Sequence, residues 1–269
     1  MAAPTSAADA AAVWHALYVS AGGSISRRVE RVAVLEADPD LAGRLTGARR
    51  ARAERMSVAT VLRRDTGRWQ AREDAGAARG GAGLLVLEGM LVRRVGLQGR
   101  FGAELLSTGD LLQPSEHDGQ AATVPFEATW RVLTPLRLAV LDLAWMARMA
   151  PFPEVAAELT RRLMVRSRRL ATMLAIAHHH RLEDRLHLFF WELADRYGRV
   201  TPDGVRLELG LTHDLIGHLV GAYRPSVSVA LARLEQDGHV RRSARGLMLL
   251  GSPPGLDETL TPRRDRRPG

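Results

Sequence analysis

Residues 211–251 read LTHDLIGHLVGAYRPSVSVALARLEQDGHVRRSARGLMLLG, and this stretch decides the fold. Thr212 is placed to cap a short helix, because its hydroxyl can accept a hydrogen bond from a free backbone N–H of the first turn. The apolar residues that follow repeat at the spacing of one helix face: Leu215, Ile216, Leu219 and Val220. Gly221 then allows the chain to leave this helix sharply.

A second helix and a hairpin complete the stretch. Pro225 suits the first turn of a helix, where its missing N–H costs nothing. The expected buried face consists of Val227, Ala230, Leu231 and Leu234. Gly238 can end the helix in a left-handed conformation, and HVRRSARGLMLL predicts a hairpin with a basic tip. Helix, turn, helix and basic hairpin is the order of a winged helix-turn-helix.

The chemistry of this unit suits duplex DNA. Arg224 opens the second helix, where a guanidinium can donate two hydrogen bonds to O6 and N7 of guanine. The candidate base-reading residues are Arg224, Pro225, Ser226 and Val229. The candidate phosphate-binding residues are Thr212, His213, Ser228, Arg241, Arg242 and Arg245. The alternative is a winged helix that binds protein instead of DNA, and the basic residues favour DNA.

Composition supports a polyanionic partner. The formal net charge is +8, and all 38 basic residues are arginine. Arginine is a permanent, planar donor that matches phosphate and guanine edges. The absence of cysteine excludes disulfides, thiolate metal sites and cysteine nucleophiles. His178, His179 and His180 are consecutive and point in different directions on a helix, so we do not expect them to bind a metal ion together. No other cofactor is expected either.

Upstream, the pattern predicts a small β-roll behind a helical segment. We expect helix over much of residues 25–64 before a strand at SVATVLRR, and a flexible loop over 74–83. LLVLEGMLVRRV predicts two strands around Gly89, and the following strands are predicted to break at Gly102, Gly109 and Thr134–Pro135.

A long amphipathic helix is predicted after Pro151 and Pro153. Its apolar face is expected to pair two chains through Val155, Leu159, Leu163, Leu170, Leu174 and Ala177. A core helix within one chain is the alternative. The predicted organisation is a flexible tail (1–24), a roll with its lead-in (25–150), a dimerisation helix (151–180), a winged helix (181–251) and a disordered basic tail (252–269).

The segment from Leu211 to Val240 resembles the helix-turn-helix of the Crp/Fnr superfamily, where Ser-Arg-Glu-Thr-Val opens the recognition helix. Residues 223–227, Tyr-Arg-Pro-Ser-Val, stand at those positions. The resemblance implies an α+β chain with a cyclic-nucleotide-binding-type roll, a dimerisation helix and a winged helix. Two features depart from the family: Pro225 and Val229 replace its usual Glu and second Arg, and Phe126 and Glu127 replace the residues that grip the cyclic-nucleotide phosphate.

We therefore expect a homodimeric, sequence-specific transcription regulator that binds a palindromic operator, with RNA polymerase as a further partner. A cyclic nucleotide is not expected, because an anion at Glu127 disfavours a phosphate. A receptor for an uncharged or apolar effector is the main alternative, and a cupin-like enzyme is disfavoured because no catalytic set is found. With no apolar run of membrane-spanning length and no secretory signal, a cytoplasmic, non-membrane location is expected.

Overall fold

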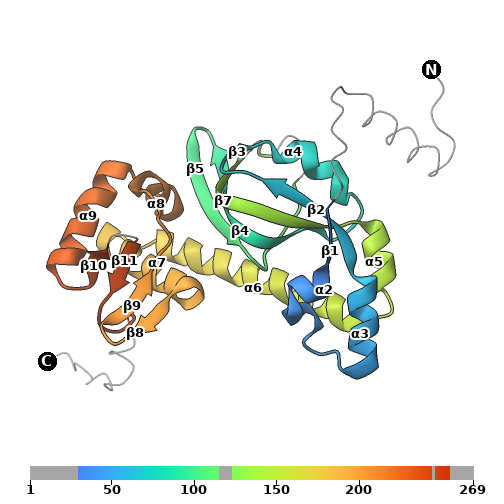
Figure 1. The fold of residues 1–269 in the computed structure, drawn as a ribbon. Coiled ribbons are helices and arrows are strands. Elements are labelled where there is room, and N and C mark those ends of the chain that lie inside the picture. Colours follow the sequence, from blue (N-terminus) through green and yellow to red (C-terminus); the bar gives the residue numbers. More distant parts are fainter. Residues whose placement is uncertain (1–29, 115–122, 244–245, 255–269) are drawn as a thin grey trace, which may run out of the picture. The chain divides into compact units, whose positions relative to one another are not determined.

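The N-terminal part of the chain folds into an antiparallel β-roll, shown in blue to green in Figure 1. The computed structural model describes residues 30–114, 123–243 and 246–254. The strands run in the order β1-β2-β7-β4-β5, while β3 pairs with β7 and β6 pairs with β4. Their bounds are β1 Arg31–Ala33, β2 Val58–Arg64, β3 Gly67–Trp69, β4 Gly83–Leu97, β5 Arg100–Ser107, β6 Leu111–Leu112 and β7 Glu127–Leu141.

Strands β4 and β7 are longer than the sequence predicts. The expected breaks at Gly89 and Thr134–Pro135 are wrong, because both strands continue through these positions. The β4–β7 ladder instead shifts register between Val86 and Leu91. Gly89 has a φ of 94°, and a Cβ there would lie 2.2 Å from the carbonyl oxygen of Pro135. A bulge at which glycine faces proline thus replaces two predicted turns.

Short helices pack on the roll. They are α2 Val34–Ala37, η1 Pro39–Ala42, α3 Gly47–Met56, α4 Ala71–Asp74, η2 Ala75–Ala78 and α5 Leu143–Met149. Trp145 of α5 is fully buried, and its Nε1 donates a hydrogen bond of 2.8 Å to the carbonyl oxygen of Ser57. The helical lead-in is corrected at Val32, which lies in β1 and pairs with Ala59. The predicted loop over 74–83 contains η2, and β5 passes through Gly102 without a break.

Two long helices follow, α6 Pro153–Ala177 and α7 Leu182–Tyr197. Pro153 begins α6, where its missing N–H is tolerated. The first turn of α7 carries Glu183 and Asp184, and its last turn carries Arg196, which suits the helix dipole at both ends. None of the described helices is long and apolar enough to cross a membrane.

The C-terminal part, orange to red in Figure 1, is a winged helix. It contains β8 Arg199–Thr201, β9 Gly204–Leu207, α8 His213–Val220, α9 Arg224–Gln236, β10 Val240–Ser243 and β11 Gly246–Leu249. The strands form a sheet of order β10-β11-β9-β8. One apolar cluster joins α7, α8 and α9 around Phe189, Phe190 and Leu231. The α+β fold expected from the sequence is therefore confirmed.

Candidate nucleic-acid interface

Helix α8 begins and ends where the sequence predicts. The hydroxyl of Thr212 accepts a hydrogen bond of 3.2 Å from the backbone N–H of Leu215, which is an N-cap. At the other end, Gly221 has a φ of 68° and a ψ of 43°, in the left-handed region. The chain therefore turns within three residues, Gly221 to Tyr223, and α9 begins at Arg224.

Helix α9 buries one face and exposes the other. Its buried residues are Val227, Ala230, Leu231 and Leu234. The exposed residues at its start include Arg224, Pro225, Ser226 and Val229, which are the four candidate base-reading residues. Arg224 makes no ion pair in the part of the chain that the structure describes. Its guanidinium is therefore available to an external acceptor.

Tyr223 was not identified by sequence reasoning as part of this surface. It precedes α9 directly, and 83% of it is exposed. A phenol can donate a hydrogen bond to a phosphate or stack on an apolar group. The signal was present, since an aromatic side chain occupies the first of the five positions that resemble the family motif.

Two candidate phosphate-binding residues bind each other. His213 Nδ1 lies 2.8 Å from the hydroxyl oxygen of Ser228, and that hydroxyl lies 3.2 Å from the carbonyl oxygen of Arg224, to which it donates. The Ser228 oxygen therefore accepts from Nδ1–H of His213. A neutral His213 then has no proton on Nε2, so it can donate to a phosphate only as an imidazolium. The pair connects α8 to the first turn of α9.

The arginines of the wing differ in whether their charge is already paired within the chain. Arg241 is exposed and has no ion-pair partner among the described residues. Arg242 is paired with Glu235, at 3.3 Å between Nε and Oε2, and its backbone N–H donates to the same carboxylate at 3.2 Å. Part of its charge is therefore already balanced. Arg245 lies outside the described residues, as do the predicted N-terminal tail and residues 255–269 of the predicted C-terminal tail.

The predicted dimerisation residues divide into two groups. Val155 and Leu159 lie in the core of the roll, at 0% and 5% exposure, so these two do not form a surface that a second chain could reach. Leu163, Leu170 and Leu174 are 45%, 45% and 62% exposed, and Ala177 is exposed as well. Met164, 62% exposed, lies beside them. The exposed apolar stripe of α6 therefore begins at Leu163.

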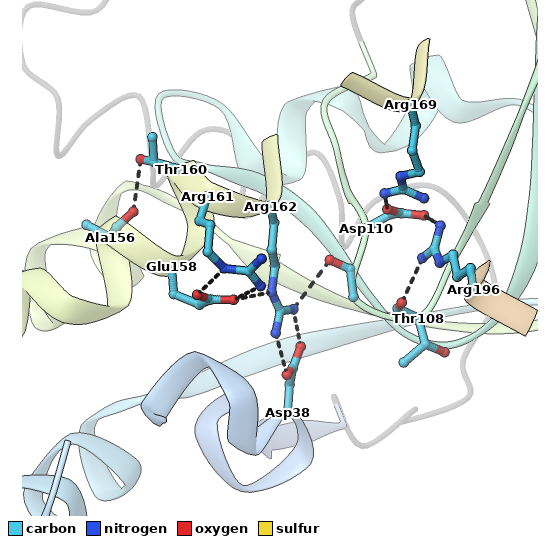
Figure 2. Close-up of polar contacts among 11 residues, drawn as sticks. Asp38, Thr108, Asp110, Ala156, Glu158, Thr160, Arg161, Arg162, Arg169 and Arg196 are labelled. Carbon is cyan, nitrogen blue, oxygen red and sulfur yellow. Dashed lines mark hydrogen bonds and ion pairs between the residues drawn. The ribbon is translucent and has the colours of Figure 1, made fainter. Parts of the chain in front are cut away.

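The face of α6 next to this stripe carries arginines that bind acids of the N-terminal part of the chain (Figure 2). Arg162 forms two hydrogen bonds to Asp38, and Arg166 forms two to Glu104, at 2.6 and 2.8 Å. Hydrogen bonding to Glu104 raises the pKa of Arg166 against the opposing effect of burial. Sequence reasoning did not identify these arginines as contacts of the roll. Their i, i+4, i+7 spacing, with Arg169 as the third member, was the available signal.

The turn before β6 joins the roll to both long helices (Figure 2). Asp110 is 4% exposed, and its carboxylate lies 2.8 Å from Arg169 of α6 and 2.8 Å from Arg196 of α7. Arg196 also donates to the carbonyl oxygen of Thr108 at 3.0 Å. Beside it, Tyr197 shares a hydrogen bond of 2.9 Å with Ser107, and burial raises the pKa of this phenol.

A second contact joins the β4–β5 hairpin to α8. Arg94 lies over the ring of Phe101 and hydrogen bonds to Nε2 of His218. Nδ1 of His218 lies 2.7 Å from the carbonyl oxygen of Asp214. Since Arg94 can only donate, Nε2 is the acceptor and Nδ1 carries the proton. His218 therefore contacts the roll through Nε2 and its own helix through Nδ1.

Two tryptophans lie in the apolar core of the roll, among leucine and valine side chains. Trp69 and Trp130 are 6% and 5% exposed, and their rings meet edge to face at 5.6 Å. Trp69 donates from Nε1 to Asp74 at 2.8 Å, and Asp74 is also paired with Arg64. Glu127, at the start of β7, is exposed. Among the described residues, no group of three histidine, aspartate or glutamate side chains could hold a metal ion.

Comparison with known proteins agrees with this geometry. Residues 184–259 match the family described as the Crp-like helix-turn-helix domain. The CRP-like cAMP-activated global transcriptional regulator of Mycobacterium tuberculosis is 28% identical over 163 residues, which are 59% of this chain and 72% of that protein.

Two solved structures show the same fold. A CooA mutant from Carboxydothermus hydrogenoformans aligns with a TM-score of 0.56 at 19% identity, covering 75% of this chain and 87% of that one. FixK2 from Bradyrhizobium japonicum aligns with a TM-score of 0.52 at 17% identity, covering 74% and 96%. At these identities the likeness shows a shared fold. Residues 184–259 therefore form a domain that is similar to the Crp-like helix-turn-helix domain.

Proposed function

We propose that the protein is a homodimeric, sequence-specific regulator that inserts α9 into the major groove of a palindromic operator. The observation that carries this proposal is the exposed start of α9, where Arg224 has no ion-pair partner among the described residues while the opposite face is buried. A helix held in this way can present a guanidinium to a guanine edge. Arg241 supports it from the wing as a phosphate contact.

The dimer is proposed to form along α6. Leu163, Leu170 and Leu174 follow a spacing of seven and four residues, which keeps them on one face of a helix. The exposed fractions of these side chains, 45–62%, are large for leucine and are explained by a second copy of the chain. A two-fold dimer would set the two recognition helices about 34 Å apart, or one turn of DNA.

The proposed partners are thus duplex DNA, a second copy of the chain and RNA polymerase, and the proposed location is the cytoplasm. Cyclic AMP is not a proposed ligand. The related Mycobacterium tuberculosis protein is described as cAMP-activated. In this chain the resemblance puts Phe126 and Glu127 at the positions of the residues that grip the phosphate, and an anion there disfavours a phosphate.

The test is selection of bound duplexes from a random library by the purified full chain, followed by gel-shift titration of the enriched sequence. The expected result is an inverted repeat with half-sites about one helical turn apart. A matched library of scrambled sequences serves as the control. Equal affinity for enriched and scrambled duplexes would contradict sequence-specific binding.

A second candidate function is a receptor for an uncharged aromatic effector. It is supported by a pocket of about 580 Å³ beside β3 and β7, lined by Trp69, Trp130 and Phe126 together with Arg68 and Thr129. Pockets of this size hold small molecules, and aromatic walls favour a flat ligand. Ligand-dependent thermal stabilisation that disappears in Phe126→Ala would support this function, and its absence across a library of such compounds would count against it.

A further inference from the structure

We propose that the recognition helix reads the methyl groups of thymine, through Val229 and Pro225, next to a guanine read by Arg224. This inference rests on the proposed function, because it assigns the bases that the same surface prefers. Thymine carries the C5-methyl group, the apolar feature of the major-groove edges. A surface that reads it must be apolar, exposed and placed beside a donor that reads a neighbouring base.

The geometry of α9 places these residues together. Successive helical residues are about 100° apart, so positions 224, 225 and 229 lie within roughly 140° of one another on the helix. Val227, Ala230, Leu231 and Leu234 are buried on the other side. Val229 is 55% exposed, and Pro225 is also exposed. The exposed side of α9 therefore presents Pro225 and Val229 as apolar side chains and Arg224 as the guanidinium without an ion-pair partner among the described residues, while Arg233 is paired with Glu183.

Neither Val229 nor Pro225 can form a side-chain hydrogen bond. Placed against guanine, cytosine or adenine, such a group would cover a donor or acceptor without replacing its bond to water, which is unfavourable. Against a thymine methyl, the same group removes apolar surface from water. The preference for thymine therefore has two sources. One is the favourable contact with its methyl group, and the other is the unfavourable burial of a donor or acceptor when another base takes its place.

The charges around this apolar face identify DNA as its occupant. Arg224 precedes it on the same helix, and Arg241 is exposed on the wing, each without an ion-pair partner among the described residues. An apolar floor flanked by cations is complementary to a groove whose floor carries methyl groups and whose walls carry phosphates.

The spacing predicts where the thymine lies. Val229 is five positions after Arg224, which is about 7.5 Å along a helix at 1.5 Å per residue. One base-pair step is about 3.4 Å, so the two contacts are roughly two steps apart. We expect each half-site to hold a G·C pair and, about two base pairs away, an A·T pair whose thymine faces Val229.

The experiment replaces each thymine of the selected operator, one position at a time, by deoxyuridine. This change removes only the methyl group. Affinity should fall about fourfold at one position of each half-site, the factor expected for one buried methyl group. Replacing that base pair by one containing 5-methylcytosine should retain more affinity than replacing it by one containing cytosine, because the methyl group is kept.

Protein variants assign the contact. Val229→Thr replaces one methyl group by a hydroxyl. In this variant and in Val229→Ala, the ratio of the affinities for the thymine and deoxyuridine operators should fall from about four towards one. Val200→Ala is the matched control, because Val200 is an exposed valine (83%) on β8, outside α9. It should leave the difference at about fourfold.

The outcomes separate this inference from the function on which it rests. A specific operator that binds equally well with deoxyuridine at every position overturns methyl reading and leaves the proposed function intact. A methyl effect that persists in Val229→Ala assigns the contact to another residue and also overturns the inference. If selection returns no preferred sequence, the proposed function and the inference fail together.

Discussion

Asp110, in the turn before β6, and Arg196, in the last turn of α7, form an ion pair of 2.8 Å that connects the roll to the winged helix. The same carboxylate is 2.8 Å from Arg169 and accepts a hydrogen bond of 2.8 Å from the backbone N–H of Ser107. The buried carboxylate of Asp110 therefore binds two arginines and the backbone of its own turn. Its removal affects three elements of the structure at once.

Asp110→Asn should destabilise the fold by about 1–3 kcal/mol, because it leaves Arg169 and Arg196 partly buried without their counter-ion. Chemical denaturation measures the change. Glu154→Gln is the control, since Glu154 pairs with Arg49 at the surface and should matter little. Equal stability of Asp110→Asn and wild type would contradict the role given to this carboxylate.

Leu174→Glu should convert the dimer to a monomer. Leu174 is 62% exposed on the α6 stripe, and pairing two chains would bury two carboxylates close together, at a cost of about 1–3 kcal/mol per chain. Light scattering at micromolar concentration measures the assembly, and operator affinity should fall with it. Thr172→Glu changes an exposed residue outside the stripe and should stay dimeric. A wild-type monomer at this concentration would refute the proposed dimer.

Arg224→Ala should weaken operator binding by about 1–3 kcal/mol and relax the preference at one base pair in each half-site. Arg241→Ala should weaken all sequences alike and reduce the salt slope by about one unit. Arg242→Ala should do so to a smaller extent, because Glu235 already balances part of that charge. Gel-shift titration at several salt concentrations distinguishes the three. Equal losses on operator and random DNA for Arg224→Ala would make Arg224 a phosphate contact.

Cyclic AMP at millimolar concentration should neither raise the melting temperature nor change DNA affinity. Glu127 would repel the phosphate. Thermal unfolding and calorimetry test both statements. Saturable binding with a micromolar dissociation constant would show that the pocket lies elsewhere in the roll.

Acid should destabilise the winged helix through His187. Burial, and then the neighbouring His239 at 4.6 Å between ring centroids, lower the pKa of His187 below its ordinary 6.5, while Asp184 opposes this. Its Nε2 accepts a hydrogen bond of 3.1 Å from Trp191, which protonation would break. Because the pKa is lower in the folded chain, this part of the stability is present above about pH 6.5 and is lost as the pH falls through the lowered value.

Unfolding measured between pH 5 and 8 checks this prediction. In His187→Phe the acid-dependent loss should be smaller than in wild type. Leu188→Ala, on the same helix, should lower stability by a similar amount at every pH. The same pH profile in wild type and His187→Phe would refute the assignment.

The winged helix could be predicted closely because its signals are local. Thr212 caps α8, Gly221 is left-handed after it, and Gly238 has a φ of 75° after α9. Each of these residues acts within one turn of its own position, so the sequence is sufficient.

The roll was harder to predict because its strands depend on partners far along the chain. Gly89 and Pro135 each resemble a turn when considered alone, yet each lies in a strand because the other supplies the space for a bulge. Likewise, Arg166 resembles a solvated residue until Glu104 of β5 is placed beside it. Val155 was assigned to the dimer because periodicity identifies an apolar face but not what covers it.

The bulge between Gly89 and Pro135 also divides the longest ladder of the molecule into two arms. Below it, Leu85 and Leu141 belong to the core shared with α5 and α6, while above it Arg94 reaches α8. The ladder is interrupted at the bulge, where the strand bends. The same strand β4 therefore belongs to the core on one side of the bend and contacts the winged helix on the other.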